Sequence, residues 1–75
     1  MKPTKMSCKL QITLNGDPHE VAAPLTVAEL LAQLDIDPRR VAVEHNLTVL
    51  KREKFSTMMV QDGDTVEIVN FVGGG

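Results

Sequence analysis

Residues 26–34, Thr26-Val27-Ala28-Glu29-Leu30-Leu31-Ala32-Gln33-Leu34, decide the fold because they carry the clearest helical pattern in the chain. Thr26 can cap the helix, and Glu29, three residues later, can complete a capping box. Four apolar side chains recur at helical spacing and share one face: Val27, Leu30, Leu31 and Leu34. The stretch Asp35-Ile36-Asp37-Pro38 is expected to end a helix of about nine residues, since Pro38 disfavours helix at Asp37. So short a helix is not stable alone in water, which predicts packing on a sheet.

The sequence before this helix predicts a β-hairpin. Apolar and polar residues alternate over residues 8–14, which is typical of a half-buried strand. Asn15-Gly16 follows and is a strong hairpin signal, because both residues accept a positive φ. Residues 19–22 form the expected returning strand. Pro18 just before them favours the sheet edge, where its missing N–H costs no ladder bond.

The sequence after the helix predicts three more strands, at residues 41–43, 48–50 and 65–72. Asn46 and residues 62–64 (Asp-Gly-Asp) mark the turns between them. Residues 51–61 show no regular pattern. Their apolar side chains, expected to anchor the segment to the core, are Phe55, Met58 and Val60.

Together these elements predict an α+β fold with a mixed sheet of four to five strands and one main helix across one face. This order matches the β-grasp, ubiquitin-like fold. The helix stripe is expected to pack against apolar strand positions, namely Leu10, Ile12, Val43, Val66 and Ile68. The predicted organisation is a flexible lead-in at 1–7, the domain at 8–72 and a flexible glycine tail at 73–75.

Length and composition favour a site on the surface or at an end of the chain. A domain of 75 residues with no Trp or Tyr has little room for an internal pocket. Eight basic residues stand against ten acidic ones without a basic patch, so a nucleic-acid partner is not expected. No apolar run predicts a membrane span or a signal peptide. A single cysteine cannot form an internal disulfide, and a cytoplasmic location is expected.

The glycine run Gly73-Gly74-Gly75 is the leading candidate for function. Glycine has no Cβ, so such a tail can thread a narrow channel. A terminal carboxyl has a pKa of about 3.3–3.7, so it is ionised at neutral pH and can attack the α-phosphate of ATP. Taken alone, terminal glycines are equally typical of a frayed end or a linker. Placed directly after the last strand of a β-grasp pattern, they favour a function.

The last predicted strand has apolar residues in both phases. Val66 and Ile68 share one face, and Val69 and Phe71 occupy the other. Apolar residues on both faces predict a strand that is covered on both sides. The second cover is either the irregular segment or a partner, and the predicted docking residues are Val69, Phe71 and Val72.

The remaining polar residues predict neither a catalytic group nor a metal site. His19 and His45 have no ligand at metal spacing and are expected at the surface or a strand edge. Residues 62–64 lack the ligand series of a calcium loop and are expected to be a plain turn. Arg39 and Arg40 are expected to be a solvated pair. Cys8 lies in the apolar phase of its strand and is expected to be a core residue rather than a sulfur acceptor.

From about residue 9 onward the chain resembles the ThiS family of sulfur carriers. The segments that carry the resemblance are residues 26–31, 37–44, 51–53 and 62–75, of which the last is the most specific. Two residues depart from the family pattern: Leu47 replaces the glycine of an Asn-Gly turn, and Lys51 replaces a proline. Both lie in the connection between the third and fourth strands, so they affect local geometry rather than the tail.

The resemblance implies a protein co-substrate for thiazole formation in thiamine biosynthesis, rather than an enzyme. A ThiF-like adenylyltransferase would use ATP and Mg²⁺ to adenylate the Gly75 carboxylate, while the carrier itself binds no cofactor. A relay from a cysteine desulfurase or sulfurtransferase would then give a thiocarboxylate, and thiazole synthase would take its sulfur. Two alternatives stay open: a sister carrier for molybdopterin, tRNA thiolation or cysteine synthesis, and a non-covalent interaction module or protein-conjugating tag.

Overall fold

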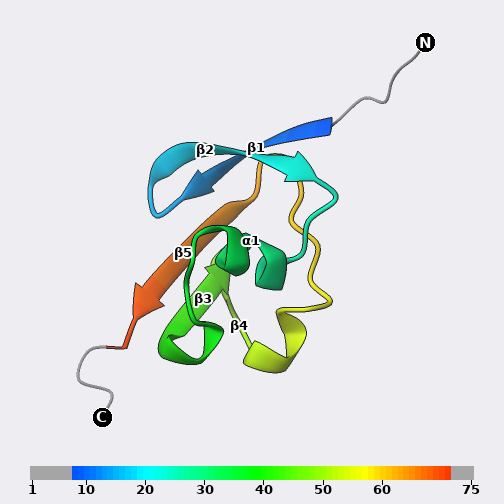
Figure 1. Cartoon of the computed structure of the whole chain (residues 1–75). Coiled ribbons are helices and arrows are strands. Elements are labelled where there is room, and N and C mark those ends of the chain that lie inside the picture. The colour runs from blue at the N-terminus through cyan, green and yellow to red at the C-terminus, as the bar shows by residue number, and fades with distance from the viewer. Residues whose placement is uncertain (1–7, 72–75) are drawn as a thin grey trace.

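The computed structural model describes residues 8–71, which form one five-stranded sheet with a helix across one face (Figure 1). The strands are β1 (Cys8–Leu14), β2 (Asp17–Ala23), β3 (Val41–His45), β4 (Thr48–Leu50) and β5 (Thr65–Asn70). Their spatial order is β2-β1-β5-β3-β4. Strands β1 and β5 pair in parallel, and the other neighbours pair antiparallel. This arrangement confirms the predicted α+β, β-grasp fold, with β2 at an edge and β5 at the centre.

The helix α1 (Val27–Gln33) begins with the predicted capping box. The Glu29 N–H donates to Thr26 Oγ1 at 3.1 Å, and the Thr26 N–H donates to Glu29 Oε1 at 2.8 Å. Two further N–H groups of the first turn donate to the irregular segment: Val27 to the Met58 carbonyl and Ala28 to the Phe55 carbonyl. The segment therefore satisfies donors that a helix start always leaves unpaired.

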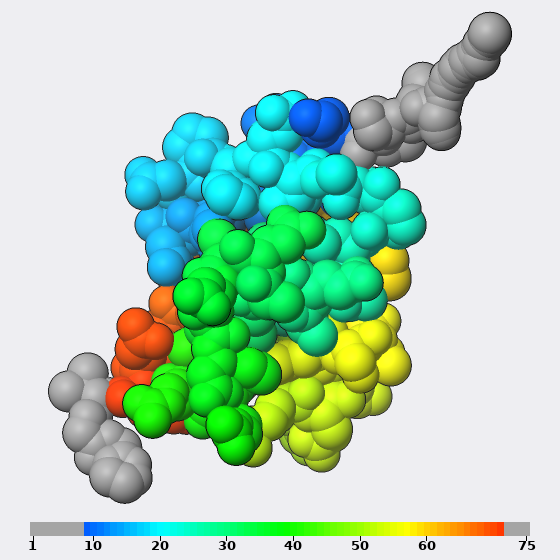
Figure 2. All heavy atoms as spheres, viewed as in Figure 1, coloured from blue at the N-terminus to red at the C-terminus, as the bar shows by residue number. Residues whose placement is uncertain are grey.

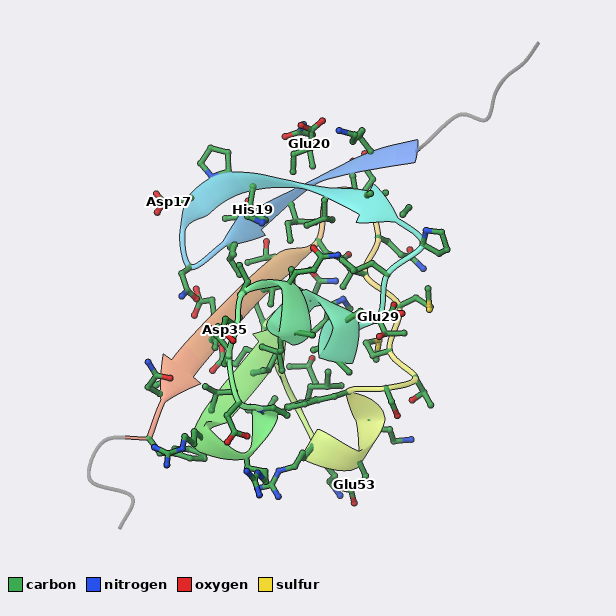
Figure 3. All side chains as sticks on the ribbon, in the orientation of Figure 1. Asp17, His19, Glu20, Glu29, Asp35 and Glu53 are labelled. Atoms are coloured by element: carbon green, nitrogen blue, oxygen red, sulfur yellow. The ribbon has the colours of Figure 1, made fainter. Side chains whose placement is uncertain are left out.

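The helix ends at Gln33, just before the predicted stop at residues 35–38, and Asp35 within that stretch provides the stop signal. Asp35 has a φ of 60°, and its N–H donates to the Ala32 carbonyl, while the Ile36 N–H donates to the Leu31 carbonyl. This pair of bonds is a Schellman motif, which normally uses glycine at the left-handed position. Figure 3 shows Glu29 and Asp35 at opposite ends of the helix. The Schellman motif was not predicted from the sequence, because aspartate occupies the position where glycine is usual.

The predicted core is confirmed. Five side chains of the helix and the central strands are less than 2% exposed: Leu30, Leu31, Val27, Val43 and Val66. Leu34, Leu10 and Ile68 are partly buried and pack against this cluster. Phe55 and Val60 are buried and anchor the segment between β4 and β5, as predicted, although this segment contains a short 3-10 helix, η2 (Arg52–Lys54), that the sequence did not suggest.

The two hairpins use the same kind of turn with different residues. Asn15 and Gly16 have φ values of 50° and 85°, and Asn46 and Leu47 have φ values of 53° and 71°. Positive φ at both central residues is the requirement of a type I′ turn. Leu47 therefore occupies a position that favours glycine, and its side chain is 85% exposed.

Several strand boundaries differ from the predicted ones, and strand β3 ends at His45 instead of residue 43. Strand β2 begins at Asp17 rather than at residue 19, because the two-residue turn pairs Leu14 directly with Asp17. A 3-10 helix, η1 (Pro38–Arg40), precedes β3 and was not predicted. Strand β5 ends at Asn70 instead of residue 72. The predicted lead-in at 1–7, Val72 and the tail Gly73-Gly74-Gly75 lie outside the described residues.

Candidate functional site

The last strand, β5, carries the chain toward the glycine tail from the centre of the sheet. It pairs with β3 over five residues, from His45↔Val66 to Val41↔Asn70. The Phe71 N–H then donates to the Arg40 carbonyl at 2.9 Å and extends this ladder by one residue. Residues up to Phe71 are therefore held by the sheet, four positions before Gly75. The other side of β5 pairs with β1 over two residues alone, Thr65 and Val66.

The face of β5 opposite the helix is open in the described residues, so of the two covers that the sequence allowed, the irregular segment is excluded and a partner remains. Val66 faces the helix and is fully buried, whereas Val69 is 56% and Phe71 54% exposed. Figure 2 views the molecule from the helix side, where the green residues of α1 and the following loop cover the sheet. The irregular segment between β4 and β5 does not bury Val69 and Phe71, because it packs at the start of the helix.

The open face continues from β5 across β3 to β4. In the ladder, Ala42 lies opposite Val69 and Glu44 opposite Glu67, and opposite residues share a face. Val49 lies opposite Glu44 on the other side and is 68% exposed. This face thus combines exposed apolar side chains with two glutamates directly across from each other. Of the predicted docking residues, the structure brings Val69 and Phe71 together, and Val72 lies outside the described residues.

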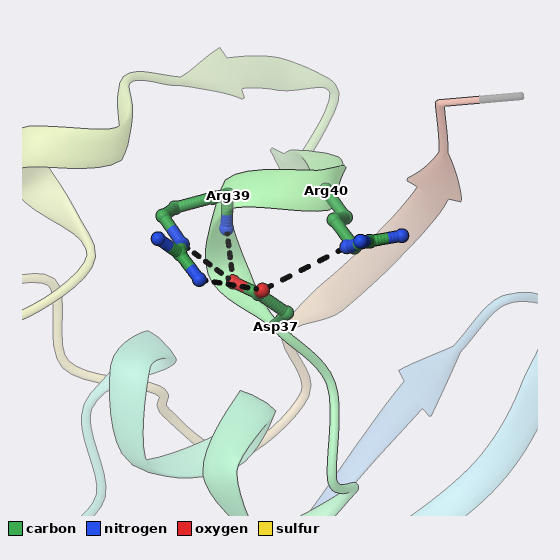
Figure 4. Close-up of polar contacts among 3 residues, drawn as sticks. All are labelled: Asp37, Arg39 and Arg40. Carbon is green, nitrogen blue, oxygen red and sulfur yellow. Dashed lines mark hydrogen bonds and ion pairs between the residues drawn. The ribbon is translucent and has the colours of Figure 1, made fainter. Parts of the chain in front are cut away.

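A charged cluster of Asp37, the N-cap of η1, with Arg39 and Arg40 lies beside the end of β5 (Figure 4). The Asp37 carboxylate accepts hydrogen bonds from the Arg39 backbone N–H, Nε and Nη2 at 2.9, 3.2 and 3.1 Å, and Arg40 Nε lies 3.8 Å away. The Arg39 side-chain hydrogen bonds lower the pKa of Asp37. Both arginine side chains remain exposed, at 76% and 82%, as predicted for a solvated pair. The Arg40 carbonyl accepts a hydrogen bond from the Phe71 N–H. The cationic side chain of Arg40 therefore lies where the chain leaves the sheet.

The opposite end of β5 is fixed by a polar network that the sequence did not predict. Asp64, buried just before β5, accepts from His45 Nε2 at 2.6 Å, Asn46 Nδ2 at 3.1 Å and the Gln61 N–H at 2.9 Å. The Thr65 N–H donates to Asn46 Oδ1, and the Asn46 N–H donates to the Thr65 carbonyl, both at 2.8 Å. His45 is therefore a partly buried structural residue, and the prediction of a surface or strand-edge residue was wrong.

Burial and hydrogen bonding shift the pKa of Asp64 in opposite directions. Burial raises the pKa of this carboxyl, but the hydrogen bonds from His45, Asn46 and Gln61 outweigh it and leave the pKa below its ordinary value. Asp64 is thus ionised at neutral pH and accepts hydrogen bonds only, so His45 Nε2 must carry the proton. The turn at 62–64 was predicted correctly. The burial of Asp64 was missed because it depends on the β3–β5 register, which a local pattern does not contain.

Two familiar features, a metal cluster and a membrane-spanning helix, are absent from the part of the chain that the structure describes. Residues 8–71 contain no group of three or more histidine, cysteine, aspartate or glutamate side chains placed to hold a metal ion. Within the same range, no helix is both long and apolar enough to span a bilayer.

A small β-grasp domain with an exposed apolar face at the end of its last strand, followed by a glycine tail, defines a ubiquitin-like carrier. The model of the ThiS family matches residues 12–75. The chain therefore belongs to the ThiS family, the sulfur carriers of thiamine biosynthesis.

Individual relatives agree with this assignment. A crystal structure of a thiamine biosynthesis protein (ThiS) from Geobacter metallireducens is 45% identical, with a TM-score of 0.77 over 88% of this chain and all of that one. The sulfur carrier protein ThiS of Escherichia coli is 36% identical over 66 residues, which are 88% of this chain and all of that protein. A thiazole synthase from Paramagnetospirillum magneticum is 41% identical over 66 residues, and this chain spans 20% of its length.

Proposed function

We propose that the Gly75 carboxylate is the group that carries sulfur, with Gly73 and Gly74 as the segment that threads into each partner enzyme. Gly75 then has to be the free C-terminus of the functional protein. The observation that most supports the proposal is the end of β5, where a strand held by the sheet carries exposed Val69 and Phe71 a few residues before the glycines. A partner that covers these two side chains would hold the tail close to its own reactive centre.

In the first step, a ThiF-like adenylyltransferase with ATP and Mg²⁺ adenylates the tail. A carboxylate oxygen of Gly75 attacks the α-phosphorus of ATP, the bond to the β-phosphate breaks, and pyrophosphate leaves. The absence of a Cβ at the last three residues leaves space around the reacting carbonyl carbon. In this step the carrier positions its carboxylate for attack, and the partner enzyme supplies the catalytic groups.

In the second step, sulfur replaces AMP. The terminal sulfur of a cysteine persulfide, from a desulfurase or sulfurtransferase relay, attacks the acyl carbon and AMP leaves. A thiol then attacks the cysteine sulfur of the resulting acyl disulfide, which forms a new disulfide and releases the thiocarboxylate. Thiazole synthase is the proposed acceptor of this sulfur, in line with the thiazole synthases whose sequences match this chain over about a fifth of their length.

The experiment that tests this proposal compares tail variants in pyrophosphate exchange with the ThiF-like adenylyltransferase of the same organism. Deletion of Gly75 should abolish exchange, and Gly74→Val should reduce it at least about a hundredfold, because a β-branched side chain crowds the channel. Both variants should unfold at the same temperature as the wild type. Normal exchange by the truncated protein would contradict the proposal. The intact mass of the native protein should show a chain that ends at Gly75, with one oxygen replaced by sulfur in the loaded form.

A further inference from the structure

Among residues 8–71, one backbone edge of β5 has no partner strand over its last residues. The ladder with β1 ends at Val66, because β1 turns into the hairpin at Asn15. Figure 1 shows β3 along one side of the lower half of β5 and, within residues 8–71, no strand along the other. A central strand therefore becomes an edge strand over its last residues.

The hydrogen bonds fix which backbone groups face this open edge. In an antiparallel ladder, residues alternate between facing their partner strand and facing away from it. The Phe71 N–H binds the Arg40 carbonyl, so residues 67, 69 and 71 face β3, and residues 66, 68 and 70 face the other side. The Ile68 N–H points to that side as expected, since it donates to Asn15 Oδ1 at 2.6 Å.

The Asn15 residue continues the ladder for one step beyond the end of β1. Its N–H donates to the Val66 carbonyl at 2.9 Å, and its side-chain oxygen accepts from Ile68. Beyond this point the Ile68 carbonyl and both the N–H and the carbonyl of Asn70 face outward. None of these three groups has a hydrogen-bond partner among residues 8–71.

We propose that this open edge of β5, at Ile68 and Asn70, receives an extended strand of the adenylating partner. An N–H and a carbonyl of one residue, side by side on a sheet edge, are the groups that a β-strand pairs with when it adds to a sheet. The edge is continuous with exposed Val69 and Phe71 and lies five residues before Gly75. A strand paired there would align the chain as it leaves the sheet. This inference rests on the proposed function, because it assigns the partner from that role.

The first test measures hydrogen exchange of the Asn70 amide in the free protein and in its complex with the ThiF-like adenylyltransferase of the same organism. The amide should exchange at least about tenfold more slowly in the complex, because a new hydrogen bond protects it. An amide that exchanges equally fast in both states would overturn the inference. Protection in the free protein that grows with concentration would also overturn it, since a second copy of the chain would then occupy the edge.

The second test uses proline at two neighbouring positions and a matched side-chain control. Asn70→Pro removes the outward N–H and should leave the folded domain intact, whereas Val69→Pro removes an N–H that faces β3 and should unfold more easily. In pyrophosphate exchange, Asn70→Pro should raise KM about tenfold or more. Asn70→Ala keeps the N–H, so its KM should rise much less than that of Asn70→Pro.

The outcomes separate this inference from the proposed function. Exchange by the wild type together with an unchanged KM for Asn70→Pro would refute the added strand and leave the carrier role intact. An absence of exchange by the wild type would refute the carrier role. An equal rise in KM for Asn70→Pro and Asn70→Ala would assign the effect to the side chain and would likewise refute the added strand.

Discussion

The two ends of β5 are built in opposite ways. At its start, Asp64, His45 and Asn46 satisfy one another and the adjacent backbone within the domain. At its end, Val69 and Phe71 are more than half exposed, and on one side the Asn70 backbone has no partner among residues 8–71. The difference teaches that stability and recognition are separated along a single strand. The start holds the strand in place, and the end is the surface that we propose a partner enzyme binds.

The largest expected effect comes from removing the buried carboxylate at the start of β5. Asp64→Ala should lower the free energy of unfolding by about 3 kcal/mol, because it leaves His45 and Asn46 without their charged acceptor. The matched control is Asp62→Ala, which removes an exposed carboxylate that accepts one hydrogen bond, from the Gln11 N–H, and should cost about 1 kcal/mol. Urea denaturation of both variants measures the difference. Equal losses would show that burial of the Asp64 network adds nothing to stability.

Low pH should reduce the free energy of unfolding, because protonation of Asp64 weakens the hydrogen bonds at the start of β5. The pKa of Asp64 is lower in the folded protein than its ordinary value of 3.8, so the folded state favours the ionised form. The stabilisation is therefore complete above pH 3.8 and is lost as the pH falls through the lower folded value. Urea midpoints of the wild type below pH 4 should fall more steeply than those of Asp64→Asn. Parallel pH profiles would contradict the assignment.

The two type I′ turns offer a smaller effect with an internal control. Leu47→Gly should stabilise the domain by about 1 kcal/mol, because glycine has no strain at a φ of 71° and the exposed leucine side chain loses little packing. The converse change, Gly16→Leu, places a side chain at a φ of 85° and should destabilise by a similar amount. Thermal unfolding of both variants tests this. A destabilised Leu47→Gly protein would mean that the leucine packs on the domain.

The smallest effect concerns the like charges on the open face. Glu67→Gln should raise the free energy of unfolding by about 0.5 kcal/mol, because Glu44 stands directly opposite in the ladder. Glu20→Gln is the control, since Glu20 lies opposite neutral Gln11 at the other side of the sheet and points away from the domain in Figure 3. Its stability should stay unchanged. An equal gain in both variants would reflect net charge rather than the Glu44–Glu67 pair.

The sequence was sufficient for features that depend on local periodicity or on a turn motif. The helix stripe, the alternation in β1 and the Asn15-Gly16 turn predicted the fold and the core. Features that depend on register or on an unusual residue were missed. The Asp64–His45 bond requires β3 to lie beside β5, and the Schellman motif at Asp35 and the turn at Leu47 lack their usual glycine.

The candidate site was also predicted only in part, because some of its features depend on tertiary structure rather than on local sequence pattern. The phase of the last strand placed Val69 and Phe71 opposite the helix, but the sequence could not decide whether another segment covers them. The exposed fractions of the two side chains leave that face open within residues 8–71. The open edge at Asn70 could not be predicted at all, because it depends on where β1 ends relative to β5.

The most direct test of the separation between the two ends of β5 is Phe71→Asp. The variant should keep the free energy of unfolding of the wild type to within about 0.5 kcal/mol, because Phe71 is 54% exposed and lies outside the core. Pyrophosphate exchange with the ThiF-like adenylyltransferase of the same organism should fall at least about a hundredfold, since a charge would enter an apolar contact. Normal exchange by a folded Phe71→Asp protein would contradict the account, and so would a large loss of stability.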